Sequence, residues 1–112
     1  MSQKDASEAT RTVLAGVAER LPFDDTTDFD DARRGLVAPL PDGGVITNDD
    51  GAAVWDVGQY DWVNQGDCPD TVHPSLWRQA QLNNIHGLFE VADGVWQARS
   101  YDISNITFIA GD

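Results

Sequence analysis

Two histidines, His73 and His86, are the side chains of this sequence that most readily bind a transition metal. They fall at opposite ends of one predicted helix, about three turns apart, so within one chain they cannot share a metal ion. His73 stands where an N-cap belongs, and His86 precedes Gly87, the predicted C-cap, where the helix dipole favours an imidazolium. The pattern favours structural roles for both histidines, with ligand binding as the alternative.

A run of five aspartates could offer oxygen ligands to a hard cation such as Ca²⁺. It lacks the Asp-x-Asp-x-Asp-Gly pattern with a distal Glu that calcium loops use. The Asn48–Gly51 segment, NDDG, fails the same test and is typical of a turn. A solvated acidic face is the favoured interpretation for the run, which comprises Asp24, Asp25, Asp28, Asp30 and Asp31.

Other catalytic patterns are missing from the sequence. It contains no Gly-rich phosphate loop, no cysteine pair and no Ser/His/Asp arrangement at a recognisable spacing. The single cysteine, Cys68, cannot form an internal disulfide and is interpreted as a passive thiol. The residues therefore predict no catalytic residue, no metal ligand and no cofactor in this chain. Four tryptophans indicate a core or a buried interface: Trp55, Trp62, Trp77 and Trp96.

The charge is strongly negative, at −12 over 112 residues, and 16 of the 19 acidic residues are Asp. Nucleic acid and anionic membranes are therefore poor partners, because their phosphates would meet a negative field. At high salt the repulsion between densely spaced carboxylates is screened, so the acidic composition predicts a halophilic origin. The alternative is an ordinary acidic surface encoded by a GC-rich genome. The length allows one small domain.

The N-terminal residues predict a helix over 7–21 with an apolar stripe, ended by Pro22. They show neither a signal peptide nor a membrane anchor, so a cytoplasmic protein is expected. An acidic loop follows, with a helical turn over 28–34 that Gly35 closes.

The rest of the chain predicts two β-hairpins around a helix. The first hairpin turns at Asn48–Gly51, and the second turns at Asp93-Gly94. Pro74 begins the middle helix, with Leu76, Ala80 and Ile85 on one stripe. A last strand, ITFIAGD, has no successor within the chain. The fold class expected is α+β.

Four segments together resemble the start of the alkyl sulfatases, the dodecyl-sulfate hydrolases of the metallo-β-lactamase superfamily. The string PSLWRQAQLN, followed by GLFEV and D-x-SN-x-TFI, is specific to that family. The segments are DFDDARRGLVAPLP (28–41), VWDVGQYDWV (54–63), GDCPDTVHPSLWRQAQLNNIHGLFEV (66–91) and DGVWQARSYDISNITFIAGD (93–112).

The resemblance implies a much longer zinc hydrolase that acts on alkyl sulfates as a homodimer with two zinc ions, and that also has a sterol-carrier-like domain. It divides this chain into an N-terminal helix with acidic loop, 1–27, and an incomplete metallo-β-lactamase-like part, 28–112. The final strands would start an αβ/βα sandwich, and the family's zinc motif would come after them. No catalytic or metal-binding residue of the family matches a position of this chain, so the chain on its own is expected to be inactive. The family has Asn where this chain has His73.

Two other functions compete with this interpretation. The first is a short, non-catalytic acidic interaction module, which would bind another chain, including the remainder of such an enzyme, through its exposed sheet edge and its tryptophans. The second is an independent enzyme with a site built from the aspartate run. This independent enzyme is the least favoured of the interpretations.

Overall fold

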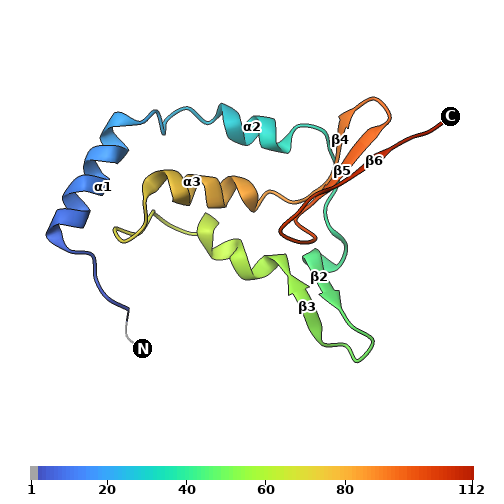
Figure 1. The fold of residues 1–112 in the computed structure, drawn as a ribbon, viewed down its shortest axis with the longest axis horizontal. Coiled ribbons are helices and arrows are strands. Elements are labelled where there is room, and N and C mark those ends of the chain that lie inside the picture. The colour runs from blue at the N-terminus through green and yellow to red at the C-terminus, as the bar shows by residue number, and fades with distance from the viewer. Residues whose placement is uncertain (1–2) are drawn as a thin grey trace.

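The computed structural model describes residues 3–112 as an elongated unit with extents of 58 × 38 × 19 Å. Helix α1 (Glu8–Arg20) lies at one end, α2 (Thr27–Arg33) and α3 (Pro74–Asn83) lie side by side in the middle, and the strands β4, β5 and β6, within residues 87–109, gather at the other end (Figure 1). The predicted α+β class is confirmed, since the chain combines helices with sheets whose strand pairs are all antiparallel.

Helix α1 spans Glu8–Arg20, as the apolar spacing predicted. Ser7 caps it, because its side-chain oxygen accepts a hydrogen bond from the Thr10 backbone N–H at 3.2 Å. No residue of α1 is buried, and its closest tie to the rest of the chain is the ion pair between Arg11 and Asp70, 2.5 Å apart. The helix therefore lies on the surface rather than in the core.

Helix α2 spans Thr27–Arg33, which confirms the predicted turn, and Gly35 follows it with φ +77°. The Gly35 carbonyl accepts a hydrogen bond from Glu90 N at 2.8 Å. The glycine thus reverses the chain and brings it against a strand more than 50 residues further along.

Helix α3 spans Pro74–Asn83 and ends three residues earlier than predicted, since Gly87 was the expected C-cap. Its C-cap is Asn84, whose N–H donates to the Ala80 and Gln81 carbonyls. Gly87 is instead the first residue of a strand, with φ +137°. A Cβ at Gly87 would lie 2.6 Å from the Ala38 carbonyl oxygen, so the glycine allows two strands to approach rather than capping a helix.

The predicted apolar stripe of α3 was also wrong. Leu76 is exposed, Ile85 lies beyond the helix, and Trp77 is the buried residue of α3. The buried face is therefore shifted by one residue from the predicted one, because the indole of Trp77 buries more apolar surface than Leu76 can.

The main sheet is antiparallel with strand order β1-β4-β5-β6. The predicted second hairpin and last strand are confirmed, and β1 was not predicted. Trp96 pairs with Glu90 on one side and with Phe108 on the other, so these three side chains share one sheet face. The strands are β1 (Leu36–Ala38), β4 (Gly87–Ala92), β5 (Val95–Arg99) and β6 (Ile106–Ile109).

The first predicted hairpin is also confirmed, as β2 (Val45–Thr47) and β3 (Ala53–Asp56). The Asn48 side-chain oxygen accepts hydrogen bonds from the N–H groups of Asp50 and Ala52, which fixes the turn. Two 3₁₀ segments were not predicted: η1 (Pro41–Gly44) and η2 (Val57–Asn64).

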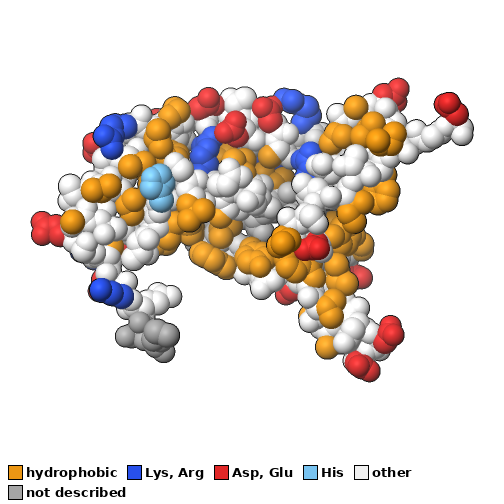
Figure 2. Space-filling model, in the orientation of Figure 1, with side chains coloured by type: hydrophobic (Ala, Val, Ile, Leu, Met, Phe, Trp, Pro, Cys, Tyr) orange, Lys and Arg blue, Asp and Glu red, His pale blue; other side chains and the backbone are white. Residues whose placement is uncertain are grey.

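The core is small, and its buried side chains come from the η2 segment, α3, β4, β5 and the loop before η1. Much apolar surface remains open around it, as the space-filling view shows over the hairpins and the lower edge (Figure 2). The side chains that are both buried and apolar are Leu40, Val57, Val63, Trp77, Phe89 and Ala98. A core of this size, with so much open apolar surface, is typical of a unit that packs against further protein.

His73 caps α3 as predicted, because its Nδ1 accepts a hydrogen bond from Ser75 N at 3.2 Å. Asparagine is a stronger N-cap residue, so His73→Asn is expected to raise the free energy of unfolding by about 0.5 kcal/mol. His73→Ala is expected to lower it by about 1 kcal/mol. Urea unfolding measures both changes, and an asparagine variant less stable than the histidine protein would contradict the cap assignment.

Candidate functional site

The two histidines do not form a site. His73 caps the start of α3, and His86 lies beyond its C-cap Asn84, in the link to β4. The predicted place of His86 just inside a C-cap was therefore wrong, since the helix ends earlier. Its Nδ1 atom is buried and has no hydrogen-bond partner among residues 3–112. The whole of α3 separates the histidines, so they do not converge.

Several aspartates of the run make hydrogen bonds and ion pairs with neighbouring residues, and they do not converge on a central point. Thr27 donates two hydrogen bonds to Asp25, from its hydroxyl at 2.6 Å and from its N–H at 3.0 Å. These bonds, with the hydroxyl contributing most, hold the pKa of the Asp25 carboxyl below its usual range. Asp31 pairs with Arg34 of the following turn.

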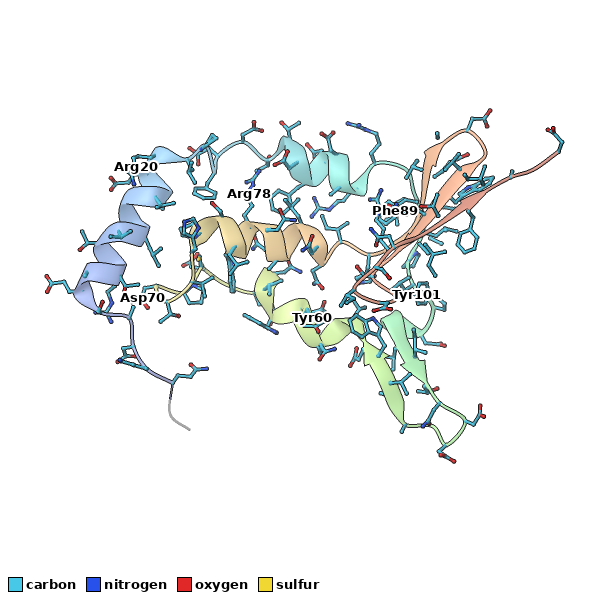
Figure 3. The ribbon with its side chains drawn as sticks, viewed as in Figure 1. Arg20, Tyr60, Asp70, Arg78, Phe89 and Tyr101 are labelled. Atoms are coloured by element: carbon cyan, nitrogen blue, oxygen red, sulfur yellow. The ribbon has the colours of Figure 1, made fainter. Side chains whose placement is uncertain are left out.

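Arg78 of α3 connects the helix to this acidic segment. Its guanidinium donates to the carbonyl oxygens of Phe23 at 3.4 Å and of Asp25 at 2.5 Å, and lies 3.4 Å from the Asp28 carboxylate. Arg78 lies between α3 and the chain that leads into α2 (Figure 3). The acidic segment is therefore anchored by structural contacts.

Residues 3–112 contain no group of three or more His, Cys, Asp or Glu side chains placed to hold a metal ion. The described chain also contains no helix that is both long enough and apolar enough to cross a membrane. The two zinc ions implied by the family resemblance thus do not fit the residues present here. Their ligands would have to come from other parts of the protein.

Cys68 lies half-buried near the Val72 carbonyl oxygen, 3.5 Å from its Sγ. Burial raises the pKa of the Cys68 thiol above its usual range, so little thiolate forms near neutral pH. Alkylation by iodoacetamide is therefore expected to be slower at pH 7 than for a free cysteine and to reach its midpoint at higher pH. A rate at pH 7 above that of free cysteine would contradict this passive role.

The four tryptophans do not share one environment. Trp77 is buried, whereas Trp62 is 57% exposed and packs its ring on Trp77 with centroids 5.6 Å apart. Trp55 is half-buried and donates its indole N–H to the Ser100 carbonyl at 2.8 Å. Trp77 thus lies in the core, Trp96 is half-buried, and an interface role for the exposed Trp62 stays a prediction.

Two cavities open between the elements. One, of about 690 Å³, lies between α1 and α3 and is walled by Leu14, Phe23, Phe29 and Trp77. The other, of about 490 Å³, lies where the C-terminal end of α3, the η2 segment and the β5–β6 turn meet. Tyr60 marks its η2 side in Figure 3. Neither cavity was indicated by the sequence, since each joins segments far apart in the chain.

This second cavity combines apolar walls with polar groups. Its walls include the rings of Trp55 and Tyr60, and its polar groups include Arg99, Asn84 and Asp102. The fold is a mixed helix-and-sheet unit, and this cavity brings together residues from β3, η2, α3 and the β5–β6 turn.

Comparison with known proteins identifies the relatives of this unit. No protein-family model matches the chain. It is 48% identical over 109 residues to a linear primary-alkylsulfatase from Pseudomonas sp, covering 96% of this chain and 16% of that protein. It is 49% identical over 112 residues to an (R)-specific secondary-alkylsulfatase from Pseudomonas sp, covering 100% of this chain and 17% of that protein.

The same relationship extends to a eukaryotic protein and to a solved structure. An alkyl/aryl-sulfatase of Saccharomyces cerevisiae is 45% identical over 109 residues, covering 97% of this chain and 17% of that protein. The structure of the stereoselective inverting sec-alkylsulfatase Pisa1 from Pseudomonas sp. superposes with a TM-score of 0.87 at 50% identity, covering 99% of this chain and 17% of that one.

The predicted resemblance to the N-terminal portion of an alkyl sulfatase is therefore confirmed. The chain spans about a sixth of the length of the alkylsulfatases that it matches. The metallo-β-lactamase relationship stays a prediction.

Proposed function

We propose that this chain is part of an alkyl sulfatase, which hydrolyses the sulfate ester of an alkyl sulfate and releases sulfate and an alcohol. The observation that carries the proposal is identity of 45–49% to three alkylsulfatases along nearly the whole chain. Primary and secondary alkylsulfatases match it about equally well, so the substrate class proposed is alkyl sulfates in general.

Within such an enzyme the chain supplies structure rather than chemistry. The antiparallel sheet and the α3 helix form a framework, and no catalytic role is assigned to a residue of 3–112. We propose that residues 28–112 belong to a metallo-β-lactamase-like hydrolase domain whose zinc ligands lie outside this chain. Residues 1–27 would form an N-terminal helix and acidic loop beside it. The chain alone is proposed to be inactive, and the enzyme to be a cytoplasmic homodimer.

A second candidate function is a non-catalytic acidic interaction module. The observation that favours it is the exposed edge of the sheet, where Ile106, Phe108 and Ile109 of β6 are each more than half exposed. An open edge strand of this kind can pair with a strand of another chain.

An antibody against residues 66–112 tests the two candidates with extracts of the source organism. A polypeptide several times larger than 12.2 kDa that releases sulfate from dodecyl sulfate is expected. The 112-residue chain, assayed in parallel, is expected to release none. A native polypeptide of 12.2 kDa would contradict the sulfatase proposal and favour the interaction module.

A further inference from the structure

Arg99 of β5 lies half-buried beside the cavity at the β5–β6 turn and has no carboxylate partner among residues 3–112. Its Nε donates to the Gln97 side-chain oxygen at 2.7 Å and its Nη1 to the Ala32 carbonyl at 3.1 Å. Its guanidinium lies over the ring of Phe89, 4.1 Å from the centroid. These contacts fix the position of the charge without neutralising it.

The other half-buried arginine of the described chain, Arg78, does lie near a carboxylate, that of Asp28. Arg20 and Arg33 also lack an acidic partner among residues 3–112, but both are exposed to water, which solvates their charge. A shortage of carboxylates does not explain Arg99, because the chain has 19 acidic and 7 basic residues. A half-buried cation in such an acidic chain indicates that its counter-charge comes from outside.

The β5–β6 turn beside Arg99 is held in a defined shape. Ser100 adopts φ +73°, which is uncommon for a residue other than glycine. Trp55 donates its indole N–H to the Ser100 carbonyl, and the Ser100 hydroxyl donates to the Asn83 carbonyl at 3.2 Å. Two other elements thus hold the turn, and such strained, over-determined positions concentrate at recognition sites.

This turn presents an apolar side chain to solvent at the mouth of the same cavity. Ile103 is 95% exposed and lines the cavity with Arg99. Asp102 also lines it, but its exposed carboxylate is screened by water and accepts a hydrogen bond from Ile103 N. A partner suited to this surface would bring one carboxylate for Arg99 and an apolar group for Ile103.

We propose that the cavity receives a segment of the same alkyl sulfatase polypeptide outside residues 1–112, whose Asp or Glu side chain pairs with Arg99 and whose apolar neighbour covers Ile103. The inference rests on the proposed function. The relatives are about six times as long as this chain, so a longer polypeptide has ample residues to supply the segment. Charge complementarity favours an acidic segment, because Arg99 is the half-buried charge of the cavity, whereas the carboxylate of Asp102, also unpaired among residues 3–112, is exposed to water.

Photo-crosslinking in the native-length polypeptide tests the proposal. Benzoylphenylalanine in place of Ile103 is expected to crosslink to a peptide of the same polypeptide outside 1–112 that contains Asp or Glu. The same group at Asp49, in the exposed β2–β3 turn, serves as the control and is expected not to reach that peptide. A crosslink to a second copy, to a different protein or to residues within 1–112 would overturn the inference, as would no crosslink.

Amide substitutions then test the charge pair. Two single variants are made: one replaces the crosslinked carboxylate by its amide, and the other is Arg99→Gln. Each is expected to lower the melting temperature by at least about 3 °C. The double variant is expected to lower the melting temperature by no more than either single variant. Arg20→Gln is the control and is expected to leave it unchanged. Additive effects would overturn the inference. If Arg99→Gln prevents folding, the amide variant of the crosslinked carboxylate carries the test alone, and an unchanged melting temperature for it would overturn the inference. Sulfate release from dodecyl sulfate by the unaltered enzyme separately reports whether the proposed function holds.

Discussion

Replacing Phe89 by alanine is expected to lower the free energy of unfolding by about 3–5 kcal/mol. Phe89 has no exposed surface, and it pairs with Leu36 of β1 and Gln97 of β5. Its removal would leave a cavity at the centre of the sheet and would also take away the ring beneath Arg99. Because small domains are stable by about 5–15 kcal/mol, this one change would remove a large part of the total.

Phe108→Ala provides the matched control, since Phe108 lies on β6 of the same sheet but is more than half exposed. Its expected cost is about 1 kcal/mol, because little buried surface is lost. Urea unfolding followed by circular dichroism measures both variants. Equal losses for the two phenylalanines would show that Phe89 does not occupy the centre of the core.

Gly35→Ala is expected to lower the free energy of unfolding by at least about 3 kcal/mol. This loss exceeds the roughly 1–2 kcal/mol that left-handed backbone strain alone would cause. At φ +77°, a methyl group on residue 35 would run into the carbonyl oxygen of Glu90, well inside van der Waals contact. Relief would require β1 to move away from β4, which would break the hydrogen bond from Glu90 N to the Gly35 carbonyl.

Gly51→Ala separates the two causes, because Gly51 has nearly the same φ, +81°, with no atom within 4 Å of the added methyl. Its expected cost is the backbone strain alone, about 1–2 kcal/mol. Thermal unfolding of the two variants gives the difference between strain and collision. Equal costs would mean that β1 and β4 are not held at this distance.

Local turn chemistry made much of the fold predictable. Asn48–Gly51 and Asp93-Gly94 each predict a hairpin from residues that tolerate positive φ, and both hairpins formed. Pro74 likewise indicates a helix start that the structure contains. In each case the information lies within a few residues, so no distant contact was needed.

The unpredicted features depend on distant contacts. Strand β1 has three residues and forms only because β4, about 50 positions later, lies beside it. Gly87 does not end a helix. A glycine is required at this position because β1 approaches it closely, which the local helix pattern could not indicate. The cavity beside Arg99 joins residues from 32 to 105, and no local spacing could indicate such a site. The family motifs, in contrast, identified the relatives because they are long and specific.

The open outer strand β6 also bears on how this polypeptide behaves in solution. Residues 103–111 carry no charge and include four exposed apolar side chains of strand-forming types, which is the composition of segments that stack into fibrils. Asp102 and Asp112 flank this stretch as charged gatekeepers. The net charge of −12 keeps copies apart by repulsion, and added salt weakens that repulsion while leaving the strand unchanged. Wherever β6 is uncovered, raising the ionic strength therefore favours self-association.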